Sequence, residues 1–232
     1  MGTTRTTALA SLAEHTTFDL AIIGAGATGC GLALDAAARG FSVVLLEATD
    51  FSQGTSSRAT KLVHGGVRYL AQGNVKLVRE ALRERATLLA NAPHLAQPLA
   101  FVMPAYKIWE APFYGVGLKM YDALAGSRGL GHTEFLSATR TRELLPTVRM
   151  GGLTGGVKYW DGQFDDARVT VALARTAQAK GAVVLNHCPV TALVREGGKV
   201  TGAIARDAIG GGELRIAAKC IVNATGVWVD DV

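Results

Sequence analysis

The chain has 232 residues, 49% of them hydrophobic and 19% charged, which suits one large domain, or one domain and part of another, and excludes a disordered protein. Its net charge of +5 favours an anionic ligand, but the 24 Lys and Arg residues form no basic run, which argues against nucleic acid. The three cysteines have no metal-ligand spacing, which predicts small core residues, a reducing compartment and no metal site. No apolar run reaches the roughly 18 residues of a membrane span.

The first recognisable elements are a strand, a helix and a second strand. Residues 1–17 are rich in Thr and predict a flexible leader. Phe18–Ile23 is a short apolar run that predicts a buried parallel strand, and Ala27–Arg39 predicts a helix that ends at Gly40. Ser42–Glu47 predicts the second strand, which completes a βαβ unit with a right-handed crossover.

The middle of the chain is less regular. Residues 51–66 are polar and rich in Gly, Ser and Thr, and a helix with Asn74 as its cap is expected over 75–92. Residues 98–131 mix apolar, aromatic and Gly residues and give no clear pattern. A short helix is expected over 137–145.

The last third of the chain predicts a return to the first sheet. Strand-like residues 152–164 lead into a helix over 165–180, whose acidic first residues suit its positive end. A parallel strand, a three-stranded meander with glycine turns and a last apolar strand are then expected over 182–185, 190–195, 199–207, 213–218 and 220–223.

A dinucleotide-binding motif, Gly24-Ala25-Gly26-Ala27-Thr28-Gly29, joins the first strand to the first helix. In this context the first Gly permits a tight turn, the second lets a pyrophosphate approach the backbone, and the third lets the helix pack on the strand. The N-terminus of the helix adds free N–H groups and a partial positive charge. The alternative is a tight turn without a ligand.

Glu47 ends the second strand, where an acid accepts hydrogen bonds from ribose hydroxyls and repels a 2′-phosphate, which argues against NADP. The motif itself does not separate FAD from NAD, because both carry ADP. A pure NAD domain would continue to a third strand and helix, whereas here a segment of hydroxyls and bare glycines intervenes. Such a segment can run beside an extended cofactor and therefore favours FAD.

Four stretches, GAGATGCGLALDAAARG, SSRATKLVHGGVRYL, WDGQFDDAR and IVNATGVWVD, resemble the FAD-dependent glycerol-3-phosphate dehydrogenases of the flavin amino-acid oxidase superfamily. The resemblance runs from about Phe18 to the last residue, and the second stretch is its most specific part. It implies an α/β fold: a glutathione-reductase-type, Rossmann-like FAD-binding domain with a β-meander, plus part of a second domain. The expected FAD-binding parts are 18–97 and 151–232, and an insertion or the start of a substrate domain is expected over 98–150.

The resemblance also implies that a complete enzyme is longer than this chain. The chain is therefore expected to be a fragment, or the N-terminal part of a longer product, and to be inactive by itself. The general base and the remaining substrate contacts are expected beyond Val232.

Position by position, the resemblance implies a cofactor site and a substrate side. The residues expected at FAD are Gly24, Gly26, Ala27, Thr28, Gly29, Glu47, Ala48, Ser56, Ser57, Leu62, Gly65, Gly66, Val190, Ala224, Thr225 and Gly226. The catalytic candidates are His64, Arg68 and Tyr69. Arg68 can hold a phosphate with two parallel hydrogen bonds, and His64 can steady the reduced flavin or assist proton removal. The alternative for His64 is a hydrogen-bonded loop histidine, for Arg68 a surface ion pair and for Tyr69 an ordinary core residue.

The implied reaction is the oxidation of sn-glycerol 3-phosphate to dihydroxyacetone phosphate by hydride transfer to FAD, with electrons passing to quinone or another acceptor. Two alternatives stay open: an amine or amino-acid oxidase of the same superfamily, and a non-catalytic FAD- or nucleotide-binding module. The expected location is cytoplasmic or peripheral on the inner face of a membrane, and a homodimer is left open. Residues 105–121 alternate aromatic side chains with Lys, as an interfacial membrane contact does, but packing on the substrate domain is the favoured interpretation.

Overall fold

The computed structural model describes residues 4–70 and 72–232, and the chain in it forms two compact units. Unit 1 consists of Met1–Ala59 and Asp166–Val232, and unit 2 of Thr60–Asp165. The sequence predicted domain boundaries after residues 97 and 150 instead. They differ because 96–105 and 155–164 pair along their whole length as two antiparallel strands, which holds these two stretches in one unit.

Unit 1 contains a six-stranded sheet in the order β7-β2-β1-β10-β9-β8. Its first four strands are parallel to one another, and the last three form an antiparallel meander that shares β10 with them. The strands are β1 (Phe18–Ile23), β2 (Val43–Leu46), β7 (Val183–Leu185), β8 (Val190–Glu196), β9 (Lys199–Arg206) and β10 (Glu213–Asn223). The predicted βαβ unit and meander are thus confirmed.

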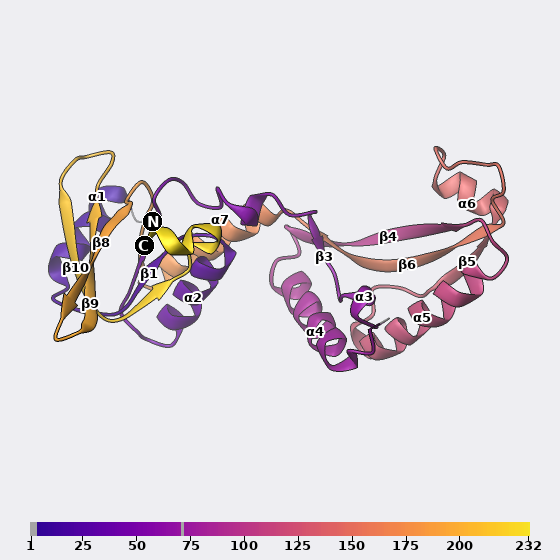
Figure 1. Cartoon of the computed structure of the whole chain (residues 1–232), viewed down its shortest axis with the longest axis horizontal. Helices are drawn as coiled ribbons and strands as arrows, with labels where there is room; N and C mark the ends of the chain where they lie inside the picture. Colours follow the sequence, from indigo (N-terminus) through magenta and orange to yellow (C-terminus); the bar gives the residue numbers. More distant parts are fainter. Residues whose placement is uncertain (1–3, 71) are drawn as a thin grey trace. The chain divides into compact units, whose positions relative to one another are not determined.

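Strand β10 corrects one detail of the prediction. The sequence predicted two strands, 213–218 and 220–223, but they form one continuous strand that pairs with β9 through its first part and with β1 through its second. No glycine stands between Ala218 and Cys220 to turn the chain. The strand therefore carries the meander directly into the parallel sheet (Figure 1).

Helices α2 (Ala27–Ala38) and α7 (Asp166–Ala179) pack on one face of this sheet. Small side chains such as Ala33 and Ala177 are fully buried there, which lets the two helices approach closely. All four residues of β2 are buried, because alternate side chains enter the cores on opposite faces of the sheet. Full burial of one Leu or Val contributes roughly 1.5–3 kcal/mol.

The other face of the sheet is covered in part by helix α1 (Arg5–Glu14), where the sequence predicted a flexible leader. Thr4 caps this helix, and Ala8 is buried against the sheet. The Arg5 guanidinium donates to the Asn186 carbonyl oxygen at 2.7 Å and pairs with the Asp207 carboxylate. Residues 1–3 of the expected leader lie outside the described residues.

Unit 2 is an antiparallel sheet with four helices packed around it. Strand β6 (Gly155–Phe164) pairs along its length with β4 (Ala96–Ala105), and on its other edge with β3 (Leu62–Val63) and β5 (Glu134–Ser137). Figure 1 shows α4 and α5 on the same face of the β4–β6 pair. The helices are α3 (Val67–Leu70), α4 (Val75–Asn91), α5 (Glu110–Ala125) and α6 (Ala138–Leu144).

Residues 98–131, which gave no clear pattern in the sequence, contain most of β4 and all of α5. Pro98 and Pro104 obscure the strand because proline cannot donate to a ladder and is confined to edge strands. The predicted α4 is confirmed, and Asn74 caps it by accepting a hydrogen bond from the Leu77 N–H at 3.1 Å.

The cysteines fit their predicted role in part. Cys30 and Cys188 are buried, whereas Cys220 is exposed in β10. Burial raises the pKa of the Cys30 thiol to about 12, so this thiol stays protonated at neutral pH.

Acid is expected to destabilise unit 1 because two of its carboxylates titrate abnormally. The Lys219 ammonium and the Ser42 donors hold the pKa of Asp19 far below its usual value, and the Arg5 guanidinium lowers the pKa of Asp207. A carboxylate whose pKa is lowered by folding contributes stability that is fully present above its unfolded pKa, about 4, and is lost progressively as the pH falls from that value through the lower folded pKa. Urea unfolding followed between pH 6 and pH 3 should therefore show falling stability below about pH 4, with a smaller loss in Asp207→Asn. Equal pH dependence in the variant and the parent would contradict this assignment.

Candidate functional site

The glycine turn between β1 and α2 is formed by backbone contacts that exclude side chains. Gly24 has φ +101°, and its N–H donates to the Leu46 carbonyl oxygen at 2.8 Å. A Cβ on Gly24 would lie 2.7 Å from the Ala224 carbonyl oxygen, and a Cβ on Gly29 would overlap the Gly24 carbonyl oxygen. These two glycines are therefore required by the fold itself.

Gly26 differs from these two glycines. It is the N-cap of α2 with φ −75°, and a Cβ built on it would meet only the Ser56 hydroxyl at 3.0 Å. Apart from the Ser56 side chain, the fold leaves open the space where a Gly26 side chain would stand, at the positive end of a helix of 12 residues. This open backbone fits a pyrophosphate, because the missing Cβ would otherwise hold the phosphates away from the N–H groups.

Glu47 points at the glycine turn. Its Oε2 accepts a hydrogen bond from the Ala25 N–H at 2.7 Å, and its Oε1 accepts from the Thr49 N–H at 2.9 Å. The carboxylate therefore lies at the carboxyl ends of the neighbouring parallel strands β1 and β2. Ala48 follows it as an exposed residue. This is where a ribose attached to a pyrophosphate at the turn would be sought.

Two further predicted segments meet the same turn. The Ser56 hydroxyl, in the short helix η1 (Thr55–Ser57), accepts a hydrogen bond from the Ala27 N–H at 2.9 Å. After β10, the Ala224 N–H donates to the Ile23 carbonyl oxygen at 2.8 Å, which seats Ala224-Thr225-Gly226 against the turn. Val190 instead begins β8 and packs with the core on the α1 side of the sheet.

The substrate-side candidates lie in unit 2, in the segment from His64 to Tyr69. Its backbone is buried at Gly65 and Gly66, whereas the side chains of His64, Arg68 and Tyr69 are exposed. Gly66 has φ +72°, and a Cβ there would lie 2.7 Å from the Tyr69 ring. Because Tyr69 is 42% exposed, it is not a core residue.

Arg68 has no surface ion pair in the described part of the chain, since no carboxylate there lies within 4.0 Å of it. The alternative interpretation of Arg68 as half of an ion pair is therefore not supported. An exposed, unpaired guanidinium keeps both edges of its fork available to an anion.

The predicted residues thus fall into two groups that belong to different units. Unit 1 holds Gly24, Gly26, Ala27, Thr28, Gly29, Glu47, Ala48, Ser56, Ser57, Val190, Ala224, Thr225 and Gly226, and unit 2 holds Leu62, His64, Gly65, Gly66, Arg68 and Tyr69.

Sequence reasoning missed a buried polar cluster under the second group. Arg85, Tyr121 and Asp161 form it, and Arg85 and Asp161 have side-chain exposures of only 1% and 5%. A signal was present, because Arg85 follows Val78 and Leu82 on the apolar face of α4. A charged residue at such a position is rarely buried without a partner.

Comparisons with known proteins agree with this geometry. The profile of the FAD dependent oxidoreductase family matches residues 19–232. The mitochondrial glycerol-3-phosphate dehydrogenase of Rattus norvegicus is 46% identical over 237 residues, covering 97% of this chain and 33% of the rat protein. The chain thus spans about a third of the length of such curated relatives.

Two solved structures are similar to the chain. The glycerol-3-phosphate dehydrogenase from Bacillus halodurans complexed with FAD superposes with a TM-score of 0.75 at 35% identity, over 99% of this chain and 38% of that one. Glycine oxidase from Bacillus cereus gives a TM-score of 0.64 at 23% identity, over 93% of this chain and 57% of that one, which shows a shared fold alone.

Two glycine substitutions should affect different properties, stability in one case and FAD affinity in the other. Gly29→Ala forces a Cβ into the Gly24 carbonyl oxygen and should cost about 1–3 kcal/mol of stability, or prevent folding. Gly26→Ala should cost about 1 kcal/mol or less, because its Cβ approaches only the Ser56 side chain, which can rotate away, yet it should lose affinity for FAD. Thermal unfolding and a flavin fluorescence titration measure the two effects. Retention of normal FAD affinity by Gly26→Ala would contradict the assigned approach of the phosphates.

Proposed function

The chain belongs to the FAD dependent oxidoreductase family, and on that premise we propose that it is the FAD-binding part of an enzyme that oxidises sn-glycerol 3-phosphate to dihydroxyacetone phosphate. Family membership confirms the resemblance, the fold class and the cofactor predicted from the sequence. The substrate is supported by 46% identity to a glycerol-3-phosphate dehydrogenase over 97% of the chain.

The observation that carries the proposal is the open backbone at Gly26. The N-terminus of α2 is proposed to bind the pyrophosphate of FAD, with the half-buried Ser56 hydroxyl giving up the Ala27 N–H to a phosphate oxygen. Glu47 is proposed to exchange its hydrogen bond from Ala25 for bonds from the ribose hydroxyls. Both exchanges replace an internal hydrogen bond with one to the ligand, so neither residue has to move far.

Arg68 is proposed to bind the phosphate of the substrate. It is exposed and has no carboxylate within ion-pair distance in the described residues, so binding a phosphate breaks no existing pair. One contact between unit charges at 4 Å is of order 4 kcal/mol at an effective dielectric of 20, before desolvation is subtracted. That is enough to orient a small phosphate ester.

Oxidation of a secondary alcohol removes a hydride from carbon and a proton from the hydroxyl. Bound FAD supplies the hydride acceptor. On the protein side, the exposed imidazole of His64 is the candidate in this chain to accept or hold the proton, because a neutral imidazole has a ring nitrogen that accepts one. Arg68 orients the substrate for this step, and Tyr69 is proposed to lie beside it.

The electron acceptor, quinone or another molecule, stays a prediction, and a homodimer stays open.

A peripheral membrane contact is supported by helix α5. Its inner face buries Leu118 and Tyr121, as the favoured packing interpretation expected, while an outer row at helical spacing exposes Trp109, Phe113, Val116 and Met120. No helix in residues 4–70 and 72–232 is long and apolar enough to cross a bilayer. The rat relative reported above is named as mitochondrial, and the cytoplasmic or inner-face location stays a prediction.

The alternative of an amine or amino-acid oxidase gains no support beyond the shared fold, because the similar glycine oxidase is only 23% identical. A non-catalytic nucleotide-binding module would bind FAD but never reduce it. Adding sn-glycerol 3-phosphate, under anaerobic conditions, to an FAD-loaded full-length protein that contains this chain separates the three functions. Bleaching of the flavin absorbance by this substrate, and not by glycine or sarcosine, is the expected result.

Arg68→Ala should weaken the use of substrate without affecting FAD content. A charge-assisted hydrogen bond contributes about 1.5–3 kcal/mol, so the substrate concentration for half-maximal flavin bleaching should rise at least about tenfold. Arg79→Ala, a change of the same kind on the exposed face of α4, is the matched control and should change neither property. If Arg68→Ala lost FAD and substrate in parallel, the residue would be structural.

A further inference from the structure

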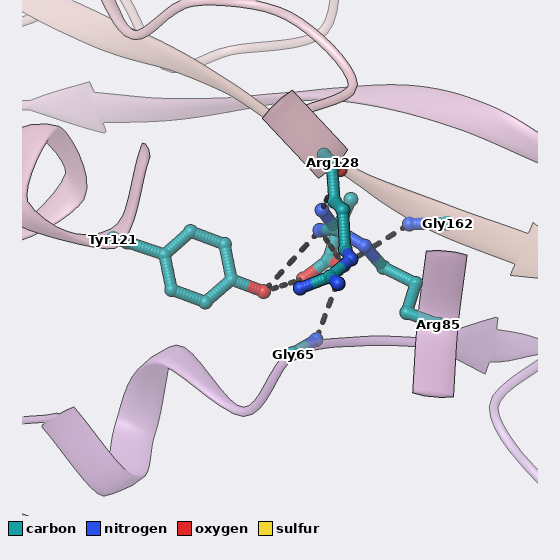
Figure 2. Close-up of polar contacts among 6 residues, drawn as sticks. Gly65, Arg85, Tyr121, Arg128 and Gly162 are labelled. Carbon is teal, nitrogen blue, oxygen red and sulfur yellow. Dashed lines mark hydrogen bonds and ion pairs between the residues drawn. The ribbon is translucent and has the colours of Figure 1, made fainter. Parts of the chain in front are cut away.

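Three buried side chains of unit 2 meet beneath the segment that carries the substrate-side candidates. Arg85 comes from α4, Tyr121 from α5 and Asp161 from β6, and together they are called the Asp161 cluster (Figure 2). None of the three was predicted as a functional residue, and the proposed function uses none of them.

The carboxylate of Asp161 is the centre of this cluster. Its Oδ1 accepts hydrogen bonds from Arg85 Nη1 at 2.9 Å, from the Gly162 N–H at 3.1 Å and from the Gly65 N–H at 3.3 Å. Its Oδ2 accepts from the Tyr121 hydroxyl at 3.0 Å. Burial, followed by the charge of Asp161, raises the pKa of Tyr121 well above its usual value, so the phenol stays protonated and keeps donating.

The cluster also fits closely under Gly65. A Cβ built on Gly65 would overlap the Tyr121 hydroxyl and would come within about 2.5 Å of Leu82 Cδ2. The N–H of Gly65 and its Cα are thus both fixed against the cluster, and the neighbouring Gly66 turns the chain at φ +72° into helix α3. Figure 2 shows the Gly65 N–H pointing toward the buried polar groups from the loop between β3 and α3.

Stability alone is a weak reason for such a cluster. A buried ion pair often contributes no more net stability than apolar side chains of similar volume, and here Arg85 Nε has no hydrogen-bond partner among the described residues. What a carboxylate provides and an apolar side chain does not is a directional acceptor for one particular backbone N–H.

We propose that Asp161 and Tyr121 are positioning residues, which hold the backbone of residues 64–69 so that His64 and Arg68 project from a fixed base. Arg85 neutralises the carboxylate and, through a hydrogen bond from Nη2 to the Arg128 carbonyl oxygen at 3.3 Å, links it to the short helix η2 (Gly126–Arg128) that follows α5. The role given to His64 and Arg68 rests on the proposed function, whereas the attachment of the segment to Asp161 does not.

Hydrogen–deuterium exchange tests this proposal without cofactor or substrate. Asp161→Ala removes the acceptor of the Gly65 N–H and should speed exchange in the peptide covering residues 62–70 at least about tenfold, with less than about threefold change in β4. Asp161→Asn combined with Arg85→Met keeps an acceptor oxygen and removes both buried charges, so it should restore exchange in 62–70 to within about threefold of the parent.

Asp122→Ala is the matched control, because this carboxylate of unit 2 also accepts a backbone N–H, from Thr133 at 2.7 Å, but makes no hydrogen bond with the described residues of 62–70. It should leave exchange in that peptide unchanged. If Asp161→Ala does not fold, Tyr121→Phe gives the same test, with faster exchange in 62–70 expected. Equal acceleration in 62–70 and in β4, no acceleration, or no restoration by the double variant would each overturn the positioning role.

The same variants separate this proposal from the proposed function. Exchange in 62–70 could be faster in Asp161→Ala while sn-glycerol 3-phosphate never reduces the flavin of the full-length parent protein. That result would support the positioning role and overturn the proposed substrate. Normal local exchange together with substrate-dependent flavin bleaching in the parent would overturn the positioning role alone.

Discussion

The close backbone contact at the carboxyl ends of β1 and β10 is the constraint on which unit 1 depends. The Ala224 carbonyl oxygen and the first turn of α2 both lie so near Gly24 that no side chain fits between them. This contact fixes where α2 begins, and hence where its positive end points. The two parallel strands on either side then bring Glu47 and residues 224–226 to the same turn. A site for a dinucleotide follows from the topology of the sheet, with few side chains needed.

Unit 2 solves a related problem by different means. Here the exposed side chains of His64 and Arg68 stand on a short segment that has too few residues to hold its own shape. Directional hydrogen bonds to a buried carboxylate replace the backbone contacts of unit 1, and glycine again permits the close approach. In both units the candidate functional groups stand on backbone whose position is fixed by close contacts beneath it.

The elements of unit 1 could be predicted from the sequence because their signals are local. β1, α2 and β2 follow from short apolar runs and glycines, and the strands of the meander follow from their turns. Three features depended on tertiary context instead. Helix α1 is held by the pairing of Arg5 with Asp207, about two hundred residues away. Strand β4 contains prolines that only an edge position tolerates. Arg85 is buried because its partner Asp161 comes from a distant strand. The position of the glycine turn was predictable from spacing, whereas the support beneath Gly65 was not.

The most direct test of the account is a titration of the protein with FAD, followed by flavin fluorescence, in the presence and absence of ADP. If the N-terminus of α2 holds the pyrophosphate and Glu47 the ribose, ADP carries the anchoring half of the ligand and should compete for the same site. FAD binding should then be saturable and should weaken in proportion to the ADP concentration. FAD binding that is indifferent to saturating ADP would contradict the assignment of the glycine turn.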